Sequence, residues 1–250
     1  MEWAAANIWF IVTVLTFISL GSWIKGLTGM GLPLFAIPAI ATMTSVEEAV
    51  TLLIIPALGS NIWLVVSHRQ YRRQVLAHIA FLIAGFAGGI VGTLLLLEIN
   101  DRWLKLALAV WLALYLLQRV FGNRFQMVFQ ARGAAAAAIG ASAGVIQGAT
   151  GISSHIVAPY FNKGDIKPGA YAFLMATSFL SFSVAQLLTA STNGLFTPDR
   201  IVIGLIALVP TLIFTQVGIA YSARISNVTF QKILFIVFLL MEIKLLWDVF

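Results

Sequence analysis

The sequence contains no cysteine, which excludes disulfide bonds, thiolate metal sites and redox chemistry at cysteine. Charged residues are also scarce: they make up 10% of the 250 residues, whereas hydrophobic residues make up 60%. A soluble domain averages roughly 45–50% apolar and about 25% charged residues. This composition predicts an integral membrane protein, and the length leaves room for one helical bundle without an attached soluble domain.

Several sequence motifs that would indicate an enzyme or a pump are missing. The chain has no G-x-x-x-x-G-K-[ST] pattern, so we do not expect it to use ATP itself. It also lacks H-E-x-x-H and paired aspartates within the apolar runs, so we expect no catalysis, no cofactor and no metal. The net charge of +6 resides in short loops, which predicts contact with lipid headgroups rather than with nucleic acid.

The apolar runs fall into two length classes. A full crossing of the bilayer needs about 20 residues in a helix. Runs that meet this length predict transmembrane helices over 48–66, 75–97, 101–120, 168–190, 199–222 and 228–250. Shorter arms at 8–22 and 27–41, and at 133–144 and 152–161, predict two re-entrant or broken helical hairpins over 8–41 and 133–161. A β-barrel would instead alternate polar and apolar residues.

A short polar motif occurs once in each hairpin. The first copy reads KGLTGMG from Lys25 to Gly31, and the second reads QGATGIS from Gln147 to Ser153. The two copies are 122 positions apart, and the same offset pairs Asn61 with Ser183. We therefore divide the chain into repeat 1 over 1–120 and repeat 2 over 121–250. Glycine breaks in matching places of two hydrophobic halves indicate the binding site of a transporter.

The placement of basic residues predicts how the repeats are oriented. If each hairpin enters and leaves on one face, each repeat adds three crossings and the two repeats are inverted. Most basic loops then share one side of the membrane, as the positive-inside rule requires, and both termini lie outside the cytoplasm. If each hairpin were a single crossing, Lys163, Lys167, Arg224 and Lys232 would move outside. The expected fold is an all-α integral membrane protein with two inverted repeats.

The helix that follows each break is expected to bind an anion, because its first N–H groups lack partners and carry the positive end of the helix dipole. Glycines would let the backbone approach the ligand, and the two threonines would either cap a half-helix or donate to the ligand. The expected substrate-binding residues are Lys25, Gly26, Thr28, Gly29, Gly31, Asn61, Gln147, Gly148, Thr150, Gly151, Ser153, Ser154, His155 and Ser183.

Lys25 and His155 each have two interpretations. Lys25 lies between two apolar arms, where a charge is costly unless it faces a cavity or a partner, so it could complement an anion. Alternatively, it extends to the membrane interface. His155 could donate to the anion or carry a proton, or it could simply pack between helices.

The G-x-T-G-x-G/S pattern near the start of each half resembles the TauE/SafE family of sulfite and organosulfur-anion exporters. The resemblance extends from Trp9 to Trp247, and the second copy has Ser153, Ser154 and His155 where glycines are common in the family. It implies a small anionic substrate such as sulfite, sulfoacetate or a related sulfonate.

These observations together predict a secondary transporter, an exporter, of a small organosulfur anion that works by alternating access. The alternatives are an anion channel and a non-catalytic membrane subunit of a larger complex. We expect the protein in the cytoplasmic (inner) membrane of a bacterium, surrounded by membrane lipid, with a homodimer as one candidate assembly.

Overall fold

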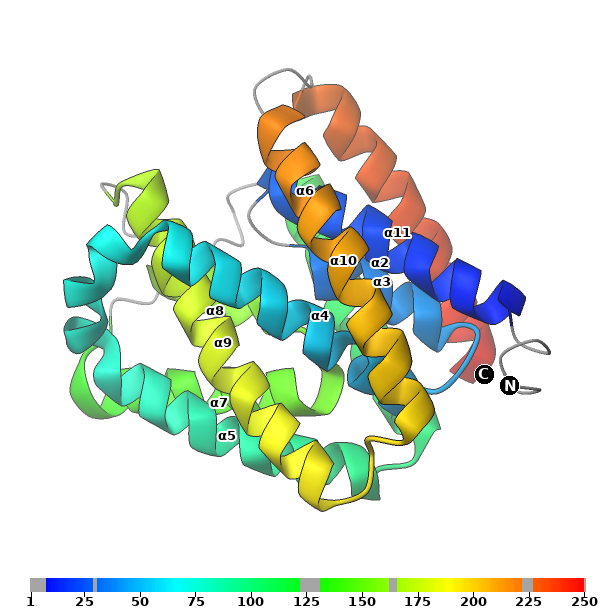
Figure 1. Cartoon of the computed structure of the whole chain (residues 1–250), viewed down its shortest axis with the longest axis horizontal. Helices are drawn as coiled ribbons and strands as arrows, with labels where there is room; N and C mark the ends of the chain where they lie inside the picture. Colours follow the sequence, from blue (N-terminus) through cyan, green and yellow to red (C-terminus); the bar gives the residue numbers. More distant parts are fainter. Residues whose placement is uncertain (1–7, 29–30, 122–130, 162–165, 222–226, 250) are drawn as a thin grey trace.

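The computed structural model describes residues 8–28, 31–121, 131–161, 166–221 and 227–249, and every regular element in these ranges is helical. The all-α class predicted from the sequence is therefore confirmed. In chain order the elements are α2 (Ile8–Thr28), α3 (Leu32–Ala41), α4 (Val46–Ser67), the 3-10 helix η1 (Arg69–His78), α5 (Ile79–Glu98), α6 (Asp101–Phe121), α7 (Gly133–Thr150), α8 (Ser154–Phe161), α9 (Pro168–Thr192), α10 (Pro198–Tyr221) and α11 (Asn227–Val249) (Figure 1).

Five stretches among the described residues are long and apolar enough to cross a membrane. They are Ile8–Leu27, Val46–Ser67, Arg69–Glu98, Pro168–Thr192 and Pro198–Tyr221. The outer faces of such helices carry large apolar side chains: Leu205, Val209 and Ile213 on α10 are each more than half exposed. A row of exposed apolar side chains along one helix is expected where lipid replaces water as the surrounding medium.

Each repeat begins with a helical hairpin whose first arm is longer than the sequence predicted. We expected the first arms to end at residues 22 and 144, but α2 and α7 continue to residues 28 and 150. A backbone in apolar surroundings stays helical until a residue that tolerates positive φ ends the pattern. Such residues follow in both hairpins, since φ is 144° at Gly31 and 72° at Gly151. Most of each motif therefore lies in the last turns of the first arm.

The second arm of the first hairpin folds back along the first arm. The rings of Phe17 on α2 and Phe35 on α3 are 6.3 Å apart, centroid to centroid, in an edge-on arrangement. A Cβ atom on Gly21 would lie 2.8 Å from the carbonyl oxygen of Leu32. The start of α3 is thus held against the last part of α2.

The two halves are interleaved, because the first arm of each hairpin packs on a helix of the other half. Helix α2 packs on α10 and α7 packs on α5 (Figure 1). Glycines allow both close contacts. A Cβ atom on Gly26 would lie 2.8 Å from the Cα of Gly218, and one on Gly92 would lie 2.9 Å from the Cα of Gly148. Because Gly26 and Gly148 are 122 positions apart, the two contacts match the repeat alignment. The division of the chain at residues 120 and 121 remains a prediction.

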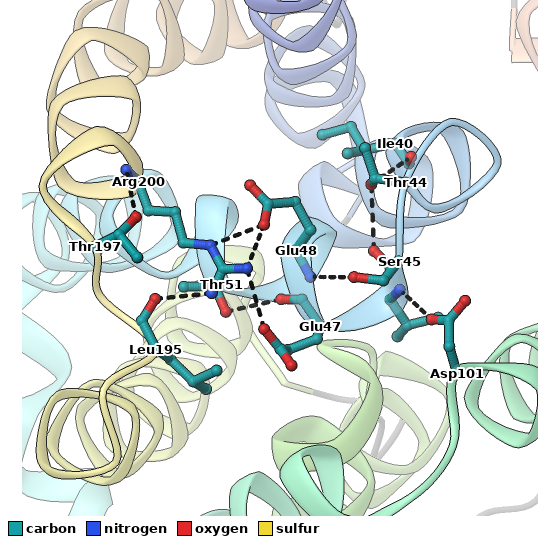
Figure 2. Close-up of polar contacts among 11 residues, drawn as sticks. Ile40, Thr44, Ser45, Glu47, Glu48, Thr51, Asp101, Leu195, Thr197 and Arg200 are labelled. Carbon is teal, nitrogen blue, oxygen red and sulfur yellow. Dashed lines mark hydrogen bonds and ion pairs between the residues drawn. The ribbon is translucent and has the colours of Figure 1, made fainter. Parts of the chain in front are cut away.

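A polar cluster joins the start of α4 to α6 and α10 (Figure 2). Ser45 caps α4, because its hydroxyl accepts the N–H of Glu48 at 3.0 Å, and Asp101 accepts the N–H of Val46 at 2.7 Å. From α10, Arg200 makes ion pairs with Glu47, at 3.1 Å, and with Glu48. The α3–α4 turn and the starts of α6 and α10 therefore lie together at one end of the bundle.

Candidate functional site

Lys25 lies in the last turn of α2 and is almost completely buried, with 5% of its surface exposed. Its Nζ donates to the hydroxyl of Ser60 at 2.8 Å and to the side-chain oxygen of Asn61 at 2.7 Å, both on α4. We refer to Lys25, Ser60 and Asn61 as the Lys25 cluster. The side chain of Lys25 crosses from α2 to α4 inside the protein and does not extend along the protein surface.

The hydrogen-bond partners of Lys25 are neutral, whereas several other basic side chains in the described part of the chain pair with carboxylates. Lys105 pairs with Asp101, Lys244 pairs with Asp248, and Arg200 pairs with two glutamates. In the described part of the chain, no carboxylate lies within ion-pair distance of Lys25. The negative end of the α2 dipole offsets only part of the ammonium charge. A buried charge without a counter-charge is costly, so this position favours an anionic ligand.

The equivalent position in repeat 2 is neutral. The side-chain oxygen of Gln147 on α7 accepts a hydrogen bond from Ser153 at 2.8 Å, across the second break. Gln186 on α9 donates to the backbone oxygen of Gln147 at 2.9 Å and covers the end of α7. We refer to Gln147, Thr150, Ser153 and Gln186 as the Gln147 cluster. No hydrogen bond within the described ranges joins it to the Lys25 cluster.

The hydroxyl of Thr150 serves the helix end and not a neighbouring element. It donates to the backbone oxygen of Ile146 at 2.8 Å and accepts weakly from the N–H of Ile152 at 3.3 Å. This is the usual bond of a threonine to its own helix, and in the described structure Thr150 does not cap the start of α8. Its alternative role in ligand binding stays a prediction. Its counterpart Thr28 ends α2, but the Thr28 side chain and the whole of Gly29 lie outside the described residues.

The glycines of the two motifs have different surroundings. A Cβ on Gly26 would lie 2.2 Å from the Thr215 carbonyl oxygen, and one on Gly148 would lie 2.5 Å from the Thr93 backbone nitrogen. These two positions are thus filled by the backbones of α10 and α5, so the glycines permit helix contact. Gly151 instead ends α7 with its N–H bonded to the Gln147 oxygen at 2.7 Å, and Gly31 begins α3.

His155 is buried beside two aromatic side chains of α6. Its ring centroid lies 5.2 Å from that of Trp111 and 5.7 Å from that of Tyr115. Neither ring nitrogen has a hydrogen-bond partner among the described residues. Trp111 donates to the carbonyl oxygen of Ile152 at 2.5 Å. The indole of Trp111 therefore contacts both the second break and the ring of His155. Ser154, which starts α8, is only half-buried.

The structure brings some of the expected residues together and leaves others apart. Asn61 contacts Lys25 directly, whereas its repeat counterpart Ser183 is buried on α9 without a described hydrogen bond to Gln147. Sequence reasoning missed two residues, Ser60 and Trp111. Ser60 is a hydroxyl residue next to Asn61 on an apolar helix. An indole at an apolar helix position gives no sign of its partner, because the Ile152 carbonyl comes from a distant part of the chain.

Comparison with known proteins agrees with this helical membrane architecture. Neither the curated proteins nor the solved structures gave a match. The model of one family, described as sulfite exporter TauE/SafE, matches residues 14–245, which is nearly the whole chain. That match includes most of the first hairpin, all of the second, the Lys25 cluster and the Gln147 cluster. The chain therefore belongs to the TauE/SafE family and is an integral membrane transporter.

Proposed function

We propose that this transporter is a secondary exporter of a small organosulfur anion, such as sulfite, sulfoacetate or a related sulfonate. The observation that carries the proposal is the buried ammonium of Lys25, whose two described partners are neutral oxygens. An anion beside it would supply the missing negative charge. Location in the inner membrane of a bacterium belongs to the same proposal, because export of such an anion requires passage out of the cytoplasm.

The chemistry of the Lys25 cluster supports an oxyanion. An ammonium has three N–H donors, and the bonds to Ser60 and Asn61 use two of them. The third donor remains for a sulfonate or sulfite oxygen, and a charge-assisted hydrogen bond of this kind is stronger than a neutral one. The membrane surroundings strengthen it further, since little water competes for the ammonium.

Interleaved halves support alternating access as the transport mechanism. Rocking of one repeat against the other would change which side of the membrane reaches the Lys25 cluster. In this mechanism Lys25 on the first hairpin binds the anion, and α4 and α9, one from each half, contact each other.

The proposal can be tested by counterflow in proteoliposomes. Vesicles preloaded with unlabelled sulfoacetate or sulfite are diluted into a trace of the labelled anion, and transient accumulation of label is measured. We expect accumulation with the wild type and at least about tenfold slower uptake with Lys25→Met, because a lost charge-assisted hydrogen bond is worth about 1.5–3 kcal/mol. Lys105→Met is the matched control, since Lys105 pairs with Asp101 at a helix start. Uptake without transient accumulation would indicate a channel, and wild-type rates in Lys25→Met would overturn the role of Lys25.

A further inference from the structure

Two buried hydroxyl groups on α10 have no hydrogen-bond partner among the described residues. They belong to Thr211 and Thr215, which are 0% and 1% exposed. A threonine inside a helix ordinarily donates to the carbonyl oxygen four residues earlier. Thr93 and Ser178 do so, at 2.8 and 2.9 Å. The two hydroxyls of α10 do not make this bond. Because a buried hydroxyl without a partner is costly, they indicate that a ligand binds at this position.

The position of these threonines along α10 places them near Lys25. The buried face of α10 first covers α4, where a Cβ on Gly59 would lie 2.1 Å from Leu208. It then covers α2, where Gly218 meets Gly26. Helix α10 thus passes from α4 to α2 (Figure 1), and Thr211 and Thr215 lie between Leu208 and Gly218 along it. The side chain of Lys25 bridges the same two helices at Ser60 and Asn61.

The matching contact in the other half lacks these polar groups. Gly92 and Gly218 are 126 positions apart, and that offset pairs Gly85 with Thr211 and Gly89 with Thr215. A Cβ on Gly85 would lie 2.1 Å from the ring of Phe182, which is 122 positions after Ser60. The α5–α7 contact is thus filled by glycines and an aromatic ring, where the α2–α10 contact has hydroxyls. Only the contact that contains Lys25 has both a charge and unpartnered donors.

We propose that Thr211 and Thr215 complete the anion-binding site of Lys25, so that each chain binds one oxyanion, between α2, α4 and α10. The anion oxygens accept from the third N–H of the ammonium and from the two hydroxyls. The Gln147 cluster of the other hairpin shapes the second break and binds no anion of its own. This inference rests on the proposed function, since it specifies the site at which the exported anion is held.

The test is isothermal titration of the purified full-length protein with sulfite and with sulfoacetate. We expect one anion per chain in the wild type. Replacement of either hydroxyl by a methyl group, in Thr211→Val and Thr215→Val, should weaken binding about tenfold or more, because a hydrogen bond to a charged group is worth about 1.5–3 kcal/mol. Thr211→Ser and Thr215→Ser keep the hydroxyl and should bind within a few-fold of the wild type. Thr93→Val is the matched control, because Thr93 already bonds to its own helix.

The possible results separate this inference from the proposed function. If the wild type binds neither anion, the proposed function fails and this site fails with it. If the wild type binds, Lys25→Met does not, and both valine variants bind like the wild type, the hydroxyls hold only buried water and the inference is overturned. Two anions per chain would also overturn it. If a valine variant does not yield monodisperse protein, the serine variant decides: loss of binding in a folded serine variant would contradict a role for the hydroxyl.

Discussion

At the residue scale, the arrangement around Lys25 couples stability to ligand binding. The ammonium is desolvated and held by two neutral oxygens, so part of its hydration energy is not recovered in the protein without ligand. This cost should become visible when Lys25 is removed together with the partner that it satisfies, because stability then rises while activity falls.

The first prediction is a double-substitution test of this cost. Lys25→Met alone should lower the free energy of unfolding by about 1–3 kcal/mol, because the buried oxygen of Asn61 loses its donor. Lys25→Met combined with Asn61→Leu removes both partners, so we expect it to recover that loss or exceed the wild type. Thermal unfolding of both proteins without anion measures the difference. A double variant that is less stable than Lys25→Met would contradict this explanation, because the unpaired oxygen of Asn61 would then not be the source of the loss.

The residues of the Lys25 cluster differ in how far the sequence could reveal them. Lys25 could be found because a charge between apolar arms is rare, and Asn61 because the repeat alignment pairs it with Ser183. Ser60 could not, since serine is common in membrane helices and usually bonds to its own backbone. Its part in the cluster depends on which helices meet, and periodicity within one helix does not contain that information.

At the scale of helices, two glycine contacts hold the halves together. Gly26 and Gly218 bring α2 against α10, and Gly92 and Gly148 bring α5 against α7. Small residues allow backbones in a membrane to approach closely, where van der Waals contact replaces the hydrophobic effect as the driving force. These contacts place Lys25 within reach of α4, so a change in helix spacing should affect the site as well as the stability.

The second prediction compares two glycine positions facing different neighbours. Gly26→Ala should destabilise the protein by about 1–3 kcal/mol or more, because the added methyl group meets the backbone of α10 at 2.2 Å. Gly204→Ala is the matched control on α10. Its methyl group would meet the Ile55 side chain, at 3.0 Å from Cδ1 and 3.3 Å from Cβ, and alanine favours a helix. Thermal unfolding in one detergent measures both, and equal stability of the two variants would contradict the close contact.

The sequence predicted the helices better than their ends. The long apolar runs predicted α4, α5, α9 and α10 to within a few residues, because lipid leaves the backbone no alternative to a helix. The first arms were placed six residues too short, since the motif glycines were interpreted as breaks. Gly26 and Gly148 remain helical because another helix packs on each of them, which is a tertiary effect.

At the scale of the whole molecule, polar turns gather at two different places. One contains the α3–α4 turn with Asp101 and Arg200, and the other brings Tyr71 beside Gly169 at the start of α9. In the predicted repeat alignment, the connection before α4 corresponds to the connection before α9. The inverted repeats that the sequence predicts would place these connections on opposite sides of the membrane, and the basic residues of η1 lie with the second cluster.

The third prediction concerns the sidedness of these clusters, and the absence of native cysteine makes it simple to test. Single cysteines at exposed positions replace Met43 and Asn193 near the first cluster, and Gln74 and Arg132 in the basic segments. In right-side-out membrane vesicles, a maleimide that cannot cross the bilayer should label Met43→Cys and Asn193→Cys. Gln74→Cys and Arg132→Cys should react only after permeabilisation. Labelling of all four positions from one side would contradict the inverted arrangement.

The most direct measurement of the central claim is the unfolding temperature of the purified protein with sulfite, sulfoacetate, taurine, sulfate and chloride, for the wild type and Lys25→Met. A ligand at 100 times its dissociation constant stabilises a protein by about 2.7 kcal/mol. The account predicts that sulfite or a sulfonate raises the unfolding temperature of the wild type and leaves that of Lys25→Met unchanged. Equal stabilisation of both proteins, or no stabilisation by any of these anions, would contradict an anion site at Lys25.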